Sequence, residues 1–162
     1  MLEEHRLKSK IHQCASFDCR VPTLNDYLRR YASQDKRRNI SQVFVLVNSD
    51  RPDQVIGYYT LSAAQIDVEE LSADKRRRLP CYPIPCFRMG RLAIAIDFQK
   101  SGLGKIILGC AVDRCLRARQ KVAAYALIVD ALDESAKGYY IHFGFVPFAD
   151  KPLSLYLPLG KK

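Results

Sequence analysis

The sequence predicts a mixed α/β protein of the α+β type, folded as one compact domain over residues 1–162. A chain of 162 residues is long enough to bury one hydrophobic core. Its 48% hydrophobic and 27% charged residues are typical of a globular protein rather than a disordered one. Segments with β-strand composition alternate with segments of helical periodicity, and there are no repeats or low-complexity tracts.

The first half of the chain predicts one helix and one hairpin. Pro22 and Thr23 open the helix after a polar segment over residues 1–20. The apolar face of this helix, at helical spacing, consists of Leu24, Tyr27, Leu28 and Tyr31. Residues 43–47 and 55–62 are β-rich and are separated by a turn at residues 50–53, which indicates an antiparallel pair.

The second half alternates helices and strands. Its prolines at positions 80, 83 and 85 predict an irregular loop. Asp133 is a suitable N-cap for a helix that ends near His142, where Gly144 provides the stop signal. The expected elements, in order, are a helix over 68–78, a strand over 88–96, a glycine-bearing loop over 99–104, a helix over 105–119, a strand over 124–129, a helix over 133–142, and strands over 145–148 and 153–159.

The charge balance favours a polyanionic partner. A net charge of +9 results from 26 basic and 17 acidic residues, which suits nucleic acid or an acidic protein; a solvated basic surface without a partner is the alternative. No apolar run is long enough to span a bilayer, and residues 1–10 are charged and lack the apolar core of a signal peptide. The expected location is therefore the cytoplasm.

The six cysteines fall into three pairs, each with four intervening residues. The pairs are Cys14/Cys19, Cys81/Cys86 and Cys110/Cys115. Disulfides are rare in the cytoplasm, and this spacing is at the outer edge of what zinc sites use. Free, buried thiols that pack as small hydrophobic residues are the favoured interpretation, and no metal is expected.

The loop over residues 99–104 carries the clearest chemical signal. It lies between a predicted strand and a predicted helix, where unpaired backbone N–H groups and the helix dipole attract an anion. Gly102 and Gly104 allow the backbone to approach a pyrophosphate, and Lys100 and Lys105 add positive charge. The spacing fits neither a Walker loop nor a dinucleotide fingerprint. By itself, such a loop is weak evidence, and a simple tight turn is the default interpretation.

Two motifs together resemble the GNAT acetyltransferase superfamily. Arg91-Leu92-Ala93-Ile94 followed by Gln99-x-x-Gly102-x-Gly104 is similar to its cofactor motif. About forty residues later, the segment 138–145, Gly-Tyr-Tyr-Ile-His-Phe-Gly-Phe, is similar to its aromatic signature. The resemblance implies the GNAT fold, with a mixed, mostly antiparallel central sheet flanked by helices and a cofactor loop between a strand and a helix.

Within the superfamily, the chain resembles the GNAT toxins of bacterial type II toxin–antitoxin modules over nearly its whole length. The likeness rests on the segment 57–62, on the proline-rich segment before Gly90-Arg91-Leu92-Ala93, and on the opening that begins at Phe17. Three residues depart from the pattern. Arg20 and Lys100 stand where glycine is usual, and Ala95 stands where an aspartate often follows.

The resemblance implies an acetyl-CoA-dependent N-acetyltransferase with direct attack of an amine on the thioester. Tyr140 matches the tyrosine that protonates the departing thiolate. A buried tyrosine with a purely structural hydroxyl is the alternative for this residue. The residues expected to bind the cofactor are Leu92, Ala93, Ile94, Gln99, Lys100, Ser101, Gly102, Leu103, Gly104, Lys105, Asp133 and Tyr139.

The resemblance to the toxins implies that the acceptor is the α-amino group of aminoacyl-tRNA and that its acetylation blocks translation. The sequence offers no strong general base, and an α-amino group with a pKa near ~8 is partly unprotonated without one. A tRNA also suits the basic surface. The candidate RNA contacts are Arg29, Arg30, Lys36, Arg37, Arg38, Lys75, Arg76, Arg77 and Arg78, each of which is alternatively an ordinary surface charge.

The toxin resemblance further implies a ribbon–helix–helix antitoxin, a homodimer, and contact with operator DNA only through that antitoxin. Two other functions remain open at this point. The same fold could acetylate a protein amine, a polyamine or a small molecule, and acidic residues in the acceptor groove would favour polyamines. A binding module with a degenerate cofactor site is the third interpretation, against which the intact Gly102, Gly104 and Tyr140 argue.

Overall fold

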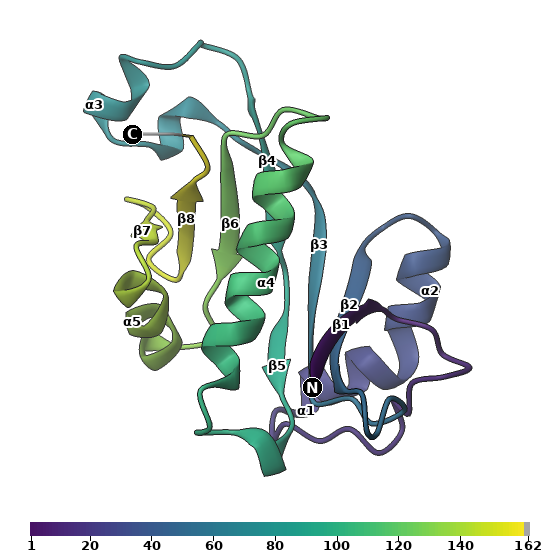
Figure 1. Ribbon diagram of the computed structural model, residues 1–162. Helices are drawn as coiled ribbons and strands as arrows, with labels where there is room; N and C mark the ends of the chain where they lie inside the picture. Colours follow the sequence, from purple (N-terminus) through teal and green to yellow (C-terminus); the bar gives the residue numbers. More distant parts are fainter. Residues whose placement is uncertain (161–162) are drawn as a thin grey trace. The chain divides into compact units, whose positions relative to one another are not determined.

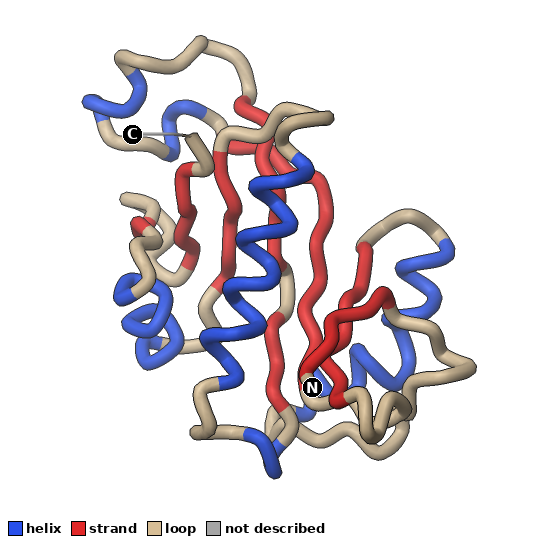
Figure 2. Tube along the Cα trace, in the orientation of Figure 1, coloured by secondary structure: helices blue, strands red, loops and turns tan. Residues whose placement is uncertain are grey.

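The computed structural model describes residues 1–160, and the described chain divides into two compact units (Figures 1 and 2). The first unit combines residues 1–62 with residues 91–112, and the second combines residues 63–90 with the chain from residue 113 onward. Strand β3 (Gly57–Ile66) and helix α4 (Leu103–Ala118) each contribute residues to both units. The expectation of a single domain remains a prediction.

The sheet of the first unit is antiparallel. β1 (Leu2–Arg6) pairs with β2 (Gln42–Asn48), and β2 pairs with β3. The short strand β5 (Leu92–Ile94) also pairs with β3, with Gly57 opposite Ile94. The sequence did not predict β1, because its residues are mostly polar and show no clear alternation of apolar and polar side chains. None of its side chains is buried, and its backbone groups form their hydrogen bonds with β2.

The helix predicted from Pro22 is present, but it contains a π-helical turn. α1 (Pro22–Asp26), η1 (Tyr27–Tyr31) and α2 (Ala32–Arg37) follow one another without a break, and the N–H of Ala32 donates to the carbonyl of Tyr27. The extra residue of a π turn rotates the next helical residues about the helix axis. Ala32 is therefore fully buried and Tyr31 is half exposed, so the prediction that Tyr31 belongs to the apolar face is wrong.

The core of the first unit lies between this helical segment and the sheet. It is formed by side chains from both layers and by Phe17, which precedes the helix. Tyr27 stacks on Tyr58 at a centroid distance of 6.3 Å, and the Tyr58 hydroxyl donates to the carbonyl of Leu24 at 2.7 Å. These contacts fix the segment 17–28 against β3.

The second unit combines parallel and antiparallel pairs. β4 (Ile84–Met89) runs parallel to β6 (Ala126–Asp130). β6 pairs antiparallel with β8 (Ser154–Pro158), and β8 pairs antiparallel with β7 (Val146–Pro147). The order of hydrogen-bonded neighbours is β1-β2-β3-β4-β6-β8-β7, with β5 beside β3. Most of the pairs described are antiparallel, as the fold class predicts.

Two predicted elements differ from the structure. The helix expected over residues 68–78 is divided into the 3-10 turn η2 (Val68–Glu70) and α3 (Ala73–Arg76), because Leu71 is buried and Ser72 caps the second piece. The strand expected over residues 88–96 begins earlier and is interrupted between Met89 and Leu92. It ends in the 3-10 turn η3 (Ile96–Phe98).

The helices around the two motifs agree with the sequence. α4 covers Leu103–Ala118, and α5 covers Glu134–His142. The carboxylate of Asp133 accepts a hydrogen bond from the N–H of Ala136 at 2.8 Å, which confirms the predicted N-cap. Gly144 has a φ of 93° just beyond α5, as expected for a residue that stops a helix.

The six cysteines, all within the described residues, form no disulfide, and they are not all buried. Cys19, Cys86 and Cys115 are buried, whereas Cys81 is exposed in the proline-rich loop, so the prediction of burial is wrong there. Burial raises the pKa of the Cys115 thiol to about 12 and that of Cys86 to about 11. Within residues 1–160, no three His, Cys, Asp or Glu side chains gather in a way that could hold a metal ion. No helix in the same range is long and apolar enough to cross a membrane.

Candidate functional site

Among the described strands, only β3 pairs with β5, although the carbonyl of Ile94 also accepts a hydrogen bond from the side chain of Gln99. Alternate backbone N–H and C=O groups of Leu92, Ala93 and Ile94 thus lack a strand partner. An extended polar ligand such as the pantetheine arm of coenzyme A can bond to such an edge.

The loop after β5 and η3 is held by its own side chains. The side-chain amide of Gln99 donates to the carbonyl of Ile94 at 2.9 Å and to that of Cys19 at 3.1 Å. The hydroxyl of Ser101 donates to the carbonyl of Phe98. These bonds tie the loop to β5 and to the segment before α1. The side chains of Gln99 and Ser101 are therefore engaged in shaping the loop.

The two residues that replace a usual glycine of the toxin pattern have a left-handed backbone. Lys100 has a φ of 62° and Arg20 has a φ of 72°, at the two positions where glycine is usual. Glycine adopts this conformation without strain, whereas for a residue with a Cβ it costs about 1 kcal/mol. The chain keeps the required geometry at both positions despite the substitutions. Gly102, in the same loop as Lys100, is also left-handed, with a φ of 81°.

The start of α4 fits a pyrophosphate. Its first turn begins at Leu103 and contains no acidic residue. Lys105 is exposed within this turn, and Lys100 is exposed in the loop before it. The free N–H groups of the turn carry partial positive charge, which the two ammonium groups reinforce. Residues 99–105 therefore offer the donors that a phosphate-bearing cofactor requires.

Gly102→Ala is expected to raise the KM for acetyl-CoA by about fivefold to tenfold. A Cβ at this position would meet no atom within 4 Å, so the cost arises from the positive φ and from the altered direction of the loop amides. Steady-state kinetics with acetyl-CoA as the varied substrate measure the effect. Gly109→Ala in α4 is the matched control, because its Cβ would also meet nothing and its helical site favours alanine. Equal KM values in the two variants would contradict the assignment of the loop.

The aromatic motif lies on α5 in the second unit. Tyr139 and Tyr140 meet edge to face at a centroid distance of 5.9 Å, and Tyr140 packs against Phe145 at 5.3 Å. The hydroxyl of Tyr139 is buried and has no hydrogen-bond partner among the described residues. An unpaired buried hydroxyl is costly, so a ligand that bonds it would stabilise this region. Asp133, by contrast, already uses a carboxylate oxygen as the cap of α5.

Tyr140 is a buried phenol whose hydroxyl donates no hydrogen bond to a described residue. Its side chain is 7% exposed, and no residue in the range 1–160 accepts a hydrogen bond from its hydroxyl. Burial is the main cause that raises the pKa of this phenol, with smaller contributions from Tyr139 and from the carboxylate of Asp130. The phenol therefore stays protonated at neutral and mildly alkaline pH.

The predicted RNA contacts form two separate groups, one in each unit. Arg29 and Arg30 lie on η1, and Lys36, Arg37 and Arg38 lie on or beside the end of α2. Lys75 and Arg76 belong to α3, with Arg77 and Arg78 directly after it. Some of these charges also have structural partners: Arg29 donates to the carbonyl of Phe17 at 2.6 Å, Lys36 donates to the carbonyl of Leu7, and Arg77 lies 3.7 Å from Asp74.

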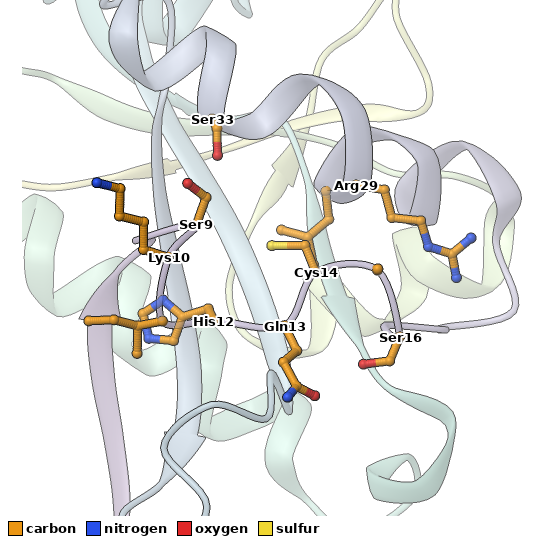
Figure 3. A pocket seen from close by; sticks show the side chains of 11 residues that line it. Ser9, Lys10, His12, Gln13, Cys14, Ser16, Arg29 and Ser33 are labelled. Carbon is orange, nitrogen blue, oxygen red and sulfur yellow. The ribbon is translucent and has the colours of Figure 1, made fainter.

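The sequence did not single out the segment 5–16, which lines two adjoining hollows in the first unit. The first has a volume of about 550 Å³, and Figure 3 shows its side chains. It is lined by Ser9, Lys10, Ile11, His12, Gln13, Cys14, Ala15, Ser16, Leu28, Arg29 and Ser33. The second has a volume of about 470 Å³ and is lined by His5, Arg6, Lys8, Ile11, His12 and Pro52. We call the two together the N-terminal groove. The alternation of basic residues with serine and histidine over 5–16 is the only sequence signal for it.

The sequence is similar to curated proteins that are toxins. The chain is 33% identical over 142 residues to a tRNA-acetylating toxin of Mycobacterium tuberculosis, and the match covers 88% of this chain and 83% of the relative. No model of a protein family matches the sequence.

Solved structures agree with this similarity over almost the whole chain. AtaT complexed with acetyl-methionyl-tRNAfMet matches with a TM-score of 0.90 and 28% identity, over 98% of this chain and 95% of that one. A tyrosine-to-phenylalanine variant of the AtaT toxin, bound to the C-terminus of the antitoxin AtaR and to acetyl-CoA, matches with a TM-score of 0.83 and 28% identity. This second match covers 98% of this chain and 93% of the variant.

Proposed function

Because the chain belongs to the family of tRNA-acetylating GNAT toxins, we propose that it transfers the acetyl group of acetyl-CoA to the α-amino group of aminoacyl-tRNA and so blocks translation. The observation that carries this proposal is the loop 99–104. In this loop, left-handed residues precede the start of α4, whose first turn contains no acidic residue. The loop follows β5, which pairs with a described strand on one side only. This arrangement suits a long cofactor with a pyrophosphate.

The donor binds along the first unit in this proposal. The backbone of Leu92, Ala93 and Ile94 holds the pantetheine arm, and the amides of residues 100–105 hold the pyrophosphate, with Lys100 and Lys105 as charge partners. Gln99 and Ser101 act by shaping the loop. Tyr139, on α5, is a further predicted cofactor contact through its unpaired hydroxyl. Asp133 contributes by capping the helix that carries both tyrosines.

Acetyl-CoA supplies an activated acetyl thioester. The neutral acceptor amine forms a new bond to the carbonyl carbon, the carbon–sulfur bond breaks with its electron pair on sulfur, and Tyr140 donates its proton to the departing sulfur. The proton that the acetylated nitrogen loses passes through water to the Tyr140 phenolate, so the products are the acetylated amine, the thiol of coenzyme A and the restored phenol. Because burial makes Tyr140 a weaker acid than an ordinary phenol, transfer to a free thiolate, whose conjugate acid has a pKa near ~8.5, is unfavourable as a separate step. We therefore expect the proton transfer to accompany carbon–sulfur cleavage.

The acceptor class follows from charge and from the pKa of the amine. An α-amino group esterified through its own carboxyl end is partly unprotonated at neutral pH, so it can attack without a dedicated base. The basic groups around Arg29–Arg38 and Lys75–Arg78 supply phosphate contacts that do not read sequence. A polyamine, which is itself cationic, would meet repulsion at the same groups.

The biological setting is part of the same proposal. A protein antitoxin of the ribbon–helix–helix type would neutralise the enzyme and carry any contact with operator DNA. We further propose a homodimer that works in the cytoplasm, where charged tRNA is found. AtaT bound to a segment of its antitoxin AtaR is the precedent among the relatives.

Transfer of radiolabelled acetyl from acetyl-CoA to a pool of charged tRNA tests this function. We expect label on charged tRNA, and none on uncharged tRNA or on charged tRNA whose α-amine is already formylated. A panel of polyamines and peptides is run alongside. Label on that panel instead would assign a different acceptor, and no label on any acceptor would overturn the enzymatic function.

A further inference from the structure

The N-terminal groove is lined without a single carboxylate. Its cationic side chains are Lys10 and Arg29 in the first hollow and Arg6 and Lys8 in the second. All four are exposed, and within the described residues Arg6, Lys8 and Lys10 form no ion pair. The potential in such a hollow is positive, because its walls concentrate the field of the cations.

Neutral donors lie between these charges. Figure 3 shows the hydroxyls of Ser9 and Ser33 near each other, with Lys10 and Arg29 on opposite sides. Hydroxyl groups flanked by cations are the donors that phosphate oxygens accept from. Cys14 and Leu28 form part of the wall.

His12 belongs to both hollows and supplies a further donor. It is 5% exposed, and its Nδ1 accepts the backbone N–H of Lys8 at 3.0 Å. Burial, followed by the charges of His5, Lys8 and Lys36, lowers the pKa of His12. The ring is therefore neutral near pH 7 with its proton on Nε2, which is left to donate to a ligand.

The groove continues toward the cofactor loop. Its first hollow shares Gln13 and Ser16 with a third, smaller hollow of about 190 Å³, which reaches Ala95 and the turn η3. Asp18 and Asp97 line this third hollow, so the proposed phosphate contacts are confined to the first two. The turn η3 ends at Phe98, one residue before Gln99 opens the loop. A strip of hollow surface within the first unit thus leads from His5 to the residues just before the predicted pyrophosphate site.

We propose that the N-terminal groove binds backbone phosphates of the unpaired end of the acceptor strand of the tRNA substrate, next to the residues that hold the acetyl donor. This inference rests on the proposed function. A polyanion satisfies several cations at once, and a positively charged channel is how proteins follow an unpaired strand. Apart from its histidines the groove contains no aromatic side chain, so it contacts the backbone and leaves the choice of tRNA to other residues.

The test is the double variant Arg6→Ala/Lys10→Ala, with Lys121→Ala as the control. Lys121 is exposed, lies after α4 in the second unit and belongs to neither basic group. At 0.15 M salt, the double variant is expected to bind uncharged tRNA about tenfold more weakly. The slope of log affinity against log salt falls in magnitude by about 1.4, or about 0.7 for each lost contact to a single strand. The KM for charged tRNA rises in parallel, while kcat and the KM for acetyl-CoA stay within about twofold.

Affinity and salt slope equal to those of Lys121→Ala would overturn the groove assignment, and a change confined to the KM for acetyl-CoA would assign the groove to the cofactor instead.

A second experiment follows the NMR signals of the histidine rings in histidine-labelled protein. Titration with a short single-stranded RNA is expected to shift the ring signals of His12 but not those of His142; unshifted His12 signals count against the proposal. If the wild-type protein leaves charged tRNA unacetylated, the proposed function fails, and the affinity and salt slope still decide whether RNA occupies the groove.

Discussion

Tyr140→Phe is expected to lower kcat for acetyl transfer by at least about a hundredfold, with the KM for acetyl-CoA changed by less than about twofold. The substitution removes one oxygen from a residue that is 7% exposed and keeps the ring contact with Phe145. A positioned general acid is typically worth a factor of 10² to 10⁴. Because no described residue accepts a hydrogen bond from this hydroxyl, its loss leaves no orphaned partner that would unfold the protein.

Steady-state kinetics on charged tRNA, together with a thermal melt, test this expectation. Tyr82→Phe is the matched control, because Tyr82 is exposed in the proline-rich loop and lies outside the predicted site. An unchanged melting temperature with a collapsed kcat supports the proton-donor role. Full activity in Tyr140→Phe would eliminate that role, and a large fall in melting temperature would assign the hydroxyl a structural function.

Gly57→Val is expected to destabilise the fold by several kcal/mol and to abolish tight binding of acetyl-CoA. A Cβ on Gly57 would lie 2.8 Å from the carbonyl oxygen of Ala93 and 2.7 Å from the terminal methyl of Ile94. The methyl can rotate away, but the carbonyl belongs to β5 and can move only with the strand. Overpacking of this kind costs about 1–3 kcal/mol for small additions, and valine adds more than one methyl group.

Chemical denaturation measures the loss of stability, and calorimetric titration with coenzyme A measures the binding. The milder Gly57→Ala should remain folded, so that the displaced β5 is visible as weaker cofactor binding in a folded protein. Gly109→Ala serves again as the control, since its added methyl group meets nothing. Wild-type stability and affinity in Gly57→Ala would mean that β5 shifts freely, which would contradict its proposed role as the strand that holds the donor.

Local sequence was sufficient to predict the chemistry-bearing elements. The helix α4, the helix α5 with its Asp133 cap, and the loop before Leu103 all have signals within a few residues of themselves, because helix periodicity, capping and glycine placement are short-range properties. The order of the two motifs was enough to predict the family, which the relatives confirm. The assignment of individual site residues stays a prediction.

Packing decided several features that local patterns did not show. The polar segment Leu2–Arg6 became a strand because β2 provides its hydrogen bonds, and the π turn moved Tyr31 out of the core in favour of Ala32. Lys100 and Arg20 could be seen to replace glycine, but only the backbone shows that both keep its left-handed conformation.

The sequence by itself determined the fold class, the enzyme family and the loop with its tyrosine motif, since each depends on residue types at fixed short spacings. Only the tertiary structure decided that residues 5–16 meet Arg29 and Ser33 to form a groove without carboxylates. These residues are separated along the chain by the start of the first helix, and their approach depends on the packing of Phe17, Tyr27 and Tyr58. The physical reason is that a hollow is formed by residues that are close in space but distant in the sequence. Their packing against one another leaves no pattern in the spacing of neighbouring residues along the chain.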